Sequence, residues 1–256
     1  MSLLKQSKIQ LSLTLLFILL LNALTSFNYQ ILISVSLAVL STVFSDFLFL
    51  KIRKVKLFFP SAAIATGLII GLLTDPNLPF YLPVLASVFA MFSKNFIRMG
   101  RHIFNPASFG LLLTSVFLGA SISWWGVAWQ IFDFSKFQTL IPFLILLSPA
   151  FVSIFRMSRF RIILSFLFIY LLGQSIFFKS LNIQTILDPT LVFFSIVMLP
   201  EPMTTPNNHL RQILFGGAVG FLVVLLSIFL LPIINLSIDP LIISLLLGNL
   251  LFFKFR

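Results

Sequence analysis

The chain has 256 residues, of which 59% are hydrophobic and only 9% are charged, and its mean hydropathy is +1.13. A soluble domain has about 25% charged and about 45–50% apolar residues, so this composition excludes a water-soluble globular protein. The apolar runs are continuous rather than alternating, which argues against a β-barrel. The net charge of +11 is typical of the inner loops of a membrane protein, rather than of a nucleic-acid-binding protein.

The absence of cysteine narrows the chemistry that this chain can perform. Without thiols it forms no disulfide, no thiolate metal site and no cysteine-ligated iron–sulfur cluster. The two histidines, His102 and His209, lie far apart and in no metal-binding motif. We therefore expect any redox chemistry to depend on an organic cofactor or on a partner chain.

Ten apolar segments follow one another along the chain, and each approaches the length of about 20 residues that a membrane-spanning helix needs. The segments cover approximately residues 9–27, 29–50, 57–74, 79–93, 103–119, 137–155, 162–178, 187–199, 213–231 and 236–253. The sequence therefore predicts an all-α polytopic membrane protein with a single membrane domain over residues 1–256.

The basic residues predict the orientation of these segments. With both termini in the cytoplasm, only Lys136 and Lys179 of the 17 lysines and arginines fall outside. Positive residues accumulate on cytoplasmic loops. We therefore expect a multi-pass protein of the cytoplasmic (inner) membrane with both ends inside.

The ten segments suggest two repeats of five, over about residues 9–119 and 137–253, with an interrupted third segment in each. An acid followed by proline closes both interrupted segments, at Asp75 and at Glu201. An odd number of helices per repeat inverts the second repeat across the membrane. A broken helix leaves free backbone groups, which membranes tolerate only around a cavity or inside protein.

Three acids are therefore candidates for an ion pathway: Asp75, Glu201 and Asp239. Each has a structural alternative. Glu201 could be an interfacial acid paired with Arg211, and Asp239, which precedes a proline, could cap a helix. Asp46, close to Lys51 in sequence, reads as a paired acid.

Three stretches resemble the RnfD/NqrB family, which supplies membrane subunits of redox-driven ion pumps that carry flavin. They are Ser61–Ile70, His102–Gly110 and Met198–Gly220, with the sequences SAAIATGLII, HIFNPASFG and MLPEPMTTPNNHLRQILFGGAVG. The resemblance implies two inverted five-helix repeats and, as partners, other redox subunits with flavin or iron–sulfur centres.

The same resemblance suggests residues around a cavity that holds a cofactor. These are Thr66, Gly67, Asn105, Pro106, Thr204 and Thr205. The alternatives are close helix packing for Thr66 and Gly67, and an ordinary helix start for Asn105 and Pro106. Gly216 and Gly220 form a GxxxG pattern, for which we expect helix packing.

The chain departs from the family where the family attaches FMN to the threonine of an S-G-A-T motif. Here the stretch reads Leu118-Gly119-Ala120-Ser121, so we expect no covalent FMN and at most a non-covalent flavin (FMN or riboflavin). Trp124, Trp125 and Trp129 follow, and their pattern suggests an aromatic belt at the membrane interface.

Two functions of different classes remain open at this point. The first is a membrane subunit of a flavin-linked electron-transport complex coupled to Na⁺ or H⁺ translocation, which the retained motifs favour. The second is a small-solute or ion channel of the same inverted-repeat fold, which the missing attachment threonine favours. A purely structural anchor for a reductase is a third interpretation.

Overall fold

The computed structural model describes residues 7–25, 28–127, 154–155, 157–178, 188–230 and 238–255. Contacts divide the chain into two compact units. Unit 1 comprises Met1–His102 with Pro106–Ile131, and unit 2 comprises Ile103–Asn105 with Phe132–Arg256. Within the described residues both units are helical, apart from one short hairpin in unit 1.

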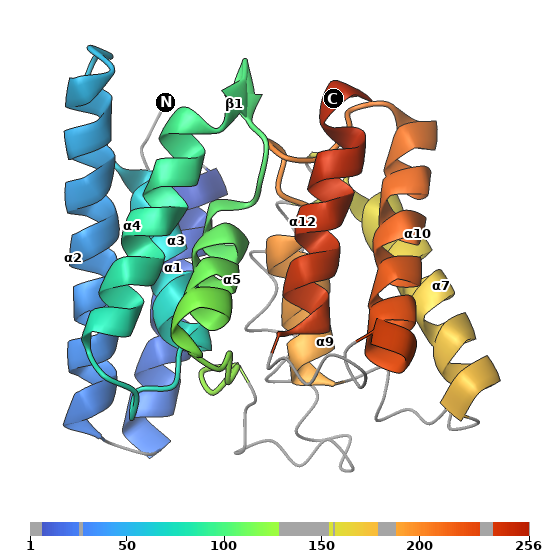
Figure 1. The fold of residues 1–256 in the computed structure, drawn as a ribbon, viewed down its shortest axis with the longest axis horizontal. Helices are drawn as coiled ribbons and strands as arrows, with labels where there is room; N and C mark the ends of the chain where they lie inside the picture. The colour runs from blue at the N-terminus through green and yellow to red at the C-terminus, as the bar shows by residue number, and fades with distance from the viewer. Residues whose placement is uncertain are drawn as a thin grey trace. The chain divides into compact units, whose positions relative to one another are not determined.

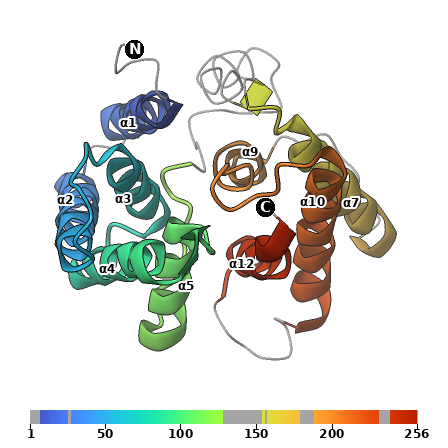
Figure 2. The ribbon, with the colours of Figure 1, turned by 90° about the horizontal axis from the view of Figure 1, so that it is seen from above.

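Unit 1 is built from five helices and the hairpin (Figure 1). Their bounds are Ser7–Thr25 (α1), Tyr29–Ile52 (α2), Ser61–Leu73 (α3), Tyr81–Phe96 (α4), Arg98–Met99 (β1), Arg101–His102 (β2) and Pro106–Leu118 (α5). The short helix α3 contacts α1, α2, α4 and α5, and Figure 2 shows it among them. Its apolar side chains Ile70, Leu72 and Leu73 are fully buried, so α3 forms the core of this unit.

Unit 2 pairs one long helix with two neighbours. Its elements are Phe160–Phe178 (α7), Pro189–Phe193 (α9), the π-helix Phe194–Met198 (η2), His209–Leu225 (α10), the π-helix Leu226–Leu230 (η3), Pro240–Phe252 (α12) and the 3₁₀ turn Phe253–Phe255 (η4). Helix α10 packs against α7 and α12. The π-helix η2 continues α9 directly, so residues 189–198 form one short helical segment.

Several helices begin where an asparagine or aspartate precedes the first turn. The side chains of Asn28, Asp188, Asn208 and Asp239 accept hydrogen bonds from backbone N–H groups of α2, α9, α10 and α12. A short polar side chain at this position satisfies N–H groups that have no partner within the helix. Local sequence therefore sets these four starts.

Glycine brings helices into close contact in both units. A Cβ atom at Gly216 would lie 2.2 Å from the carbonyl oxygen of Ile162 on α7, and one at Gly110 would lie 2.1 Å from that of Ala86 on α4. Gly220 approaches the backbone of Phe166 in the same way. The packing interpretation of Gly216 and Gly220 is therefore confirmed.

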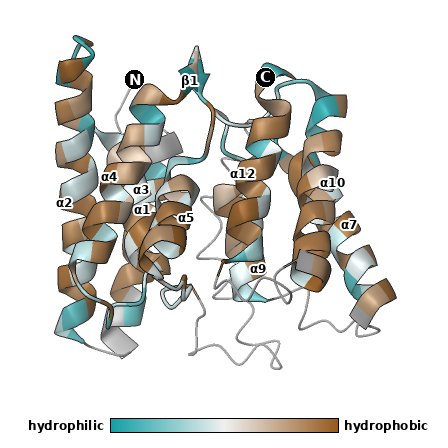
Figure 3. Ribbon diagram, in the orientation of Figure 1, coloured by the Kyte–Doolittle hydropathy of each residue, from teal (hydrophilic) through white to brown (hydrophobic). Residues whose placement is uncertain are grey.

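The outer surfaces of the helices are apolar, as a lipid environment requires. Three helices in the described part of the chain are long and apolar enough to cross a membrane: Tyr29–Ile52, Phe160–Phe177 and His209–Phe229. Large side chains such as Phe44, Phe117 and Phe168 are 64–71% exposed, and Figure 3 shows hydrophobic residues along the helices of each unit. The protein is embedded in a membrane.

The helices match the segments expected from sequence closely. Nine of the ten predicted segments coincide with described helices, and the sixth, 137–155, lies almost wholly outside the described residues. Helix α3 has 13 residues, about 20 Å at 1.5 Å per residue, which is shorter than a hydrocarbon core of about 30 Å. The ten-helix count, the cytoplasmic termini and the inverted repeat stay predictions.

Candidate functional site

The loop that follows η2 gathers polar groups around Glu201. The hydroxyl of Thr205 donates to the carbonyl oxygen of Glu201 at 2.7 Å, and that of Thr204 lies 3.3 Å from the same carbonyl oxygen and 3.4 Å from Oε2 of the carboxylate. Both threonines are fully buried, whereas Glu201 is half-buried. Glu201 therefore combines partial exposure with contacts to two buried hydroxyls.

Two asparagines tie this loop to the rest of unit 2. Asn249, fully buried on α12, accepts a hydrogen bond from the backbone N–H of Asn105 at 2.9 Å, and its Nδ2 donates to the carbonyl oxygen of Thr204 at 3.5 Å. The Nδ2 of Asn105 donates to the carbonyl oxygen of Met198 at 3.4 Å. These amides therefore hold carbonyl groups at the end of η2 and in the loop, which the π-helix itself does not satisfy.

A buried arginine fastens the far end of the loop. Arg159 is 5% exposed, and its guanidinium donates to the hydroxyl of Thr205 at 2.9 Å, to the carbonyl oxygen of Pro206, and to Oδ1 of Asn207 at 2.6 Å. Burying a cation is unfavourable unless several acceptors replace its water. Arg159 therefore fixes the loop conformation that presents Thr205 to Glu201.

Gln212 adds a buried carbonyl oxygen to the same loop. This side chain is 2% exposed, and its Nε2 donates to the carbonyl oxygen of Asn207 at 3.3 Å. Among the described residues, its Oε1 has no hydrogen-bond partner. An unsatisfied buried acceptor costs roughly 1–3 kcal/mol, so a ligand or water that pairs with this oxygen is favoured.

We refer to Glu201, Thr204, Thr205, Asn105 and Asn249 as the Glu201 cluster. Its loop side chains carry oxygen donors, namely the carboxylate of the half-buried Glu201 and the hydroxyls of the buried Thr204 and Thr205, and the Oε1 of Gln212 lies on the next helix. Oxygen donors suit hard cations. Asn105, Thr204 and Thr205 were expected at a cavity from sequence, and the structure brings all three together with Glu201. Asn249, Arg159 and Gln212 were not expected.

Asp75, the candidate acid of unit 1, occupies a different setting. Its Oδ1 accepts hydrogen bonds from the backbone N–H of Asn77 at 2.9 Å and from the Asn77 side chain at 3.1 Å. Both residues lie in the turn that follows α3, and Asp75 is half-buried. The carboxylate thus stabilises a local turn, as aspartate commonly does two residues before a backbone N–H.

The end of α3 is closed by the chain segment after α5. The last carbonyl groups of α3 accept hydrogen bonds from this segment, each at 3.0 Å. The pairs are Trp125 Nε1 to Gly71, Gly126 N–H to Leu72 and Ser123 N–H to Leu73. A helix that ends inside the protein needs such partners.

The aromatic belt expected from sequence is wrong for Trp124, which is 6% exposed. The reason is the return of residues 122–126 against α3, which buries Trp124 and directs the Trp125 ring N–H to Gly71. Trp129 lies outside the described residues. Ser121, the residue at the family's FMN attachment position, is exposed.

Unit 1 also contains a buried ion pair. Asp46 on α2 is 1% exposed, and it accepts hydrogen bonds from Lys94 Nζ at 2.7 Å and from Asn95 Nδ2 at 2.9 Å, both on α4. The sequence suggests a paired acid close to Lys51. The partner is Lys94 because position i+5 is rotated by about 140° from Asp46 around the helix, which leaves Lys51 exposed.

The other residues predicted for the site make contacts within helices, between helices or at helix starts. Thr66 donates to the carbonyl oxygen of Ala62 at 2.9 Å, and a Cβ atom at Gly67 would lie 2.5 Å from the hydroxyl of Thr42 on α2. Pro106 is the first residue of α5, and Asp239 caps α12. α2 fills the space that a side chain at Gly67 would occupy, and a role of Thr66 and Gly67 in holding a cofactor stays a prediction.

Comparison with known proteins identifies the family. The model of the NQR2, RnfD, RnfE family matches residues 3–136, more than half of the chain. The protein belongs to this family. Ser61–Ile70 and His102–Gly110 lie inside the matched range, whereas Met198–Gly220 and the Glu201 cluster, apart from Asn105, lie beyond it.

One curated relative extends the comparison. It is a subunit of the ion-translocating oxidoreductase complex of Cronobacter sakazakii (strain ATCC BAA-894), and it is 28% identical over 104 residues. This alignment covers 39% of the present chain and 30% of the relative. The chain thus matches less than a third of that relative's length.

Proposed function

We propose that the protein is a membrane subunit of an ion-translocating oxidoreductase complex, in which flavin-linked electron transport is coupled to movement of Na⁺ or H⁺. The family match over more than half of the chain carries this proposal. The name of the relative from Cronobacter sakazakii agrees with it. This chain has no cysteine to ligate an iron–sulfur cluster, so partner subunits would supply the iron–sulfur chemistry.

Within this function, we assign the ion pathway in unit 2 to the Glu201 cluster. A half-buried carboxylate beside buried hydroxyls raises the local cation concentration and offers oxygen ligands. Acids in membrane segments are functional candidates by default, since their burial is unfavourable. Asp75 is the corresponding candidate in unit 1, and Asp239 keeps its alternative as a helix cap.

We expect any flavin on this chain to be bound non-covalently. Ser121 is exposed but lacks the family's preceding serine, which Leu118 replaces. A bound flavin would supply one- and two-electron transfer. The residues of this chain position the loop after η2 and hold Glu201 beside the buried hydroxyls of Thr204 and Thr205.

Purification from its native membrane tests the proposed function. The tagged full chain, extracted in mild detergent, should co-purify with further polypeptides and with the visible absorbance of oxidised flavin or of iron–sulfur centres. A colourless protein without partners, from membranes that retain their redox activity when the gene is deleted, would refute the proposal.

Covalent attachment is tested separately on denaturing gels. We expect no flavin fluorescence in the band of this chain, even after co-expression with a flavin transferase. A fluorescent band that disappears in Ser121→Ala would contradict the expectation and place the attachment at Ser121.

A small-solute channel is the second candidate, and the missing attachment threonine favours it. Proteoliposomes with the purified chain alone distinguish the two functions. A channel would produce solute-dependent swelling without any electron donor. The redox subunit proposed here would leave the liposomes osmotically tight until an assembled complex receives electrons.

A further inference from the structure

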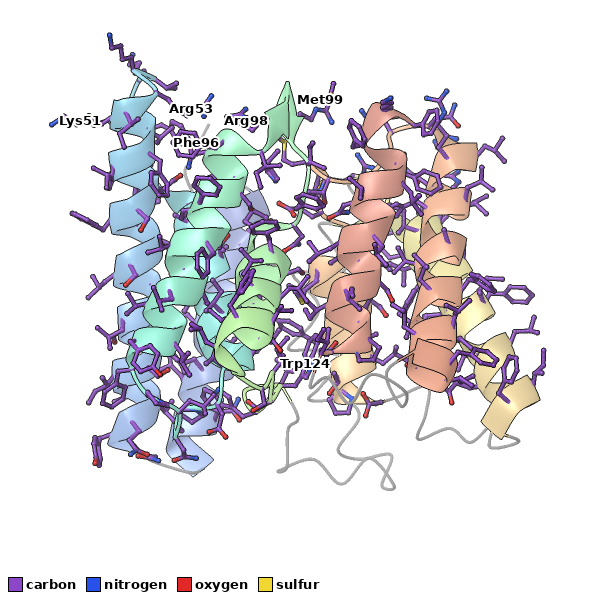
Figure 4. The ribbon with its side chains drawn as sticks, in the orientation of Figure 1. Lys51, Arg53, Phe96, Arg98, Met99 and Trp124 are labelled. Atoms are coloured by element: carbon purple, nitrogen blue, oxygen red, sulfur yellow. The ribbon has the colours of Figure 1, made fainter. Side chains whose placement is uncertain are left out.

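The end of unit 1 where α2 finishes and the β1–β2 hairpin begins carries a group of basic residues. Lys51, Arg53, Lys54 and Arg98 lie there, and Figure 4 shows Lys51, Arg53 and Arg98 at this end of the unit. Lys51, Lys54 and Arg98 are exposed, and Arg53 is half-buried. We refer to these four residues as the α2–α4 basic end.

Separate contacts hold the two guanidinium groups, and Figure 4 shows Arg53 and Arg98 at the same end of the unit. Arg53 donates to Oδ1 of Asn95 at 3.2 Å, and Asn95 in turn binds the buried Asp46. Arg98 donates to the carbonyl oxygen of Gly100 at the tip of the hairpin, at 3.0 Å. Partial burial and, to a smaller extent, the neighbouring charge of Arg53 lower the pKa of Arg98. An anion between the two would relieve their repulsion.

An aromatic surface lies directly below this basic end. Phe49 of α2 packs against Phe96 of α4 with ring centres 5.3 Å apart, and Phe92 lies 5.2 Å from Phe96. Phe92 and Phe96 are 45% and 42% exposed. Because α2 and α4 pack side by side, these rings line the junction of the two helices, with the basic residues at its end.

The backbone conformation of Lys54 supports a role for its positive charge in the α2–α4 basic end. Lys54 has φ of +55°, and the bonds from Lys54 N–H to Lys51 and from Val55 N–H to Leu50 form a Schellman ending of α2. Glycine is favoured at this position, because a side chain there costs roughly 1 kcal/mol. The chain has a lysine there, which adds a positive charge to the α2–α4 basic end.

We propose that the α2–α4 junction binds an anionic phospholipid, with the headgroup phosphate between Arg53 and Arg98 and an acyl chain along Phe92 and Phe96. Arginine forks suit phosphate oxygens, and basic clusters next to membrane segments attract anionic lipids. A lipid fits better than an acidic protein, because the basic residues lie at the end of an exposed apolar junction that an acyl chain can cover. The proposal requires only that the protein lies in a membrane, and it is independent of the redox role.

The test compares lipid retention in nanodiscs of phosphatidylcholine with increasing phosphatidylglycerol, measured by native mass spectrometry on the full chain. We expect wild type to retain phosphatidylglycerol preferentially. Arg98→Gln should weaken this retention about fivefold, as expected for one basic residue near a membrane surface. Phe96→Ala should weaken retention of phosphatidylglycerol while preserving the charge.

Arg211→Gln is the matched control. Arg211 is an exposed arginine on α10 of unit 2, 5.2 Å from the ring centre of Phe255, and its loss should leave phosphatidylglycerol retention unchanged. Equal effects of Arg98→Gln and Arg211→Gln would overturn the proposal in favour of general surface charge. Retention of soluble glycerophosphate by wild type as strongly as of phosphatidylglycerol would overturn the lipid assignment in favour of a phosphate site. A wild type without phosphatidylglycerol preference would also overturn it, leaving the basic end to an acidic protein partner.

Discussion

The carboxylates of Asp46 in unit 1 and Glu201 in unit 2 differ in burial and in the groups around them. Asp46 is 1% exposed and is paired with Lys94 and Asn95. Glu201 is half-buried beside the hydroxyl of Thr204. A fully buried, ion-paired carboxylate stabilises helix packing, whereas a half-buried carboxylate beside hydroxyl oxygens offers ligands to a cation. We therefore assign stability to the first acid and propose ion movement for the second.

The two short helical segments, α3 and η2, differ in the groups that satisfy the carbonyl groups at their ends. The end of α3 is closed by backbone N–H groups and by the Trp125 ring N–H. The end of η2 and the loop after it are held instead by side-chain amides, since Asn105 donates to Met198 and Asn249 donates to Thr204. Side chains can change partners more easily than paired backbone, so the η2 end is the better place for a ligand.

The largest expected effect is on the buried pair. Asp46→Asn should destabilise the protein by about 3 kcal/mol, the low end for a broken buried pair, because it leaves the ammonium group of Lys94, 14% exposed, without its counter-charge. Unfolding in nanodiscs measures this loss. The double variant Asp46→Leu with Lys94→Met should recover much of it, since neither charge then remains. Wild-type stability in Asp46→Asn would end the distinction between the two acids.

The amide links of the Glu201 cluster come next. Asn249→Leu preserves the branched shape of the side chain but removes the acceptor for Asn105 N–H and the donor to Thr204. Two buried groups without partners should cost about 2–3 kcal/mol, read from the same unfolding measurement. Leu251→Val, at a 59% exposed position on the same helix, is the control and should change stability little. Equal stability of both variants would show that these bonds do not hold the loop.

The backbone closure of α3 is tested by Trp125→Phe. The variant retains an aromatic ring and removes the N–H that binds Gly71, so we expect a loss of about 1–2 kcal/mol with no effect on ion movement. Accelerated hydrogen exchange at the end of α3 would accompany it. A variant that keeps full stability but alters cation uptake would place the ion pathway in unit 1 instead.

The smallest effect concerns the end of α2, where the helix stops at the surface. Lys54→Gly should stabilise the protein by up to about 1 kcal/mol in neutral lipid, since glycine adopts positive φ without strain. Thermal unfolding in phosphatidylcholine nanodiscs measures this gain. A destabilised variant would mean that Lys54 makes contacts that outweigh its backbone strain.

Most of the helices could be predicted from the sequence, for reasons visible in particular residues. Asp239-Pro240 and Asn208 mark helix starts because their side chains satisfy local N–H groups. Asp75-Pro76 and Glu201-Pro202 mark the ends of the short segments, because proline cannot continue a helix. These signals act within a few residues, so they can be recognised in the local sequence.

The long-range partners could not be predicted in this way. Lys94 is 48 residues from Asp46, and Asn249 is 144 residues from Asn105, so no local pattern joins them. The burial of Trp124 depends on the segment after α5 folding back against α3, which local sequence does not specify. Asn249 did leave a signal, since a lone asparagine in an apolar run must find a partner in the membrane.

The most direct measurement is electron-driven cation uptake by proteoliposomes that contain the assembled complex, followed for Na⁺ and for H⁺. Glu201→Gln should reduce uptake about tenfold or more, the factor that corresponds to ~1.4 kcal/mol of lost cation affinity. Its stability should change by only about 0–1 kcal/mol. Asp188→Asn is the matched control, since Asp188 caps α9 and asparagine caps a helix equally well, and it should retain uptake. Unchanged uptake in Glu201→Gln, or uptake restored by exchanging the charges of Glu201 and Arg211, would contradict the account and leave Glu201 with a structural role.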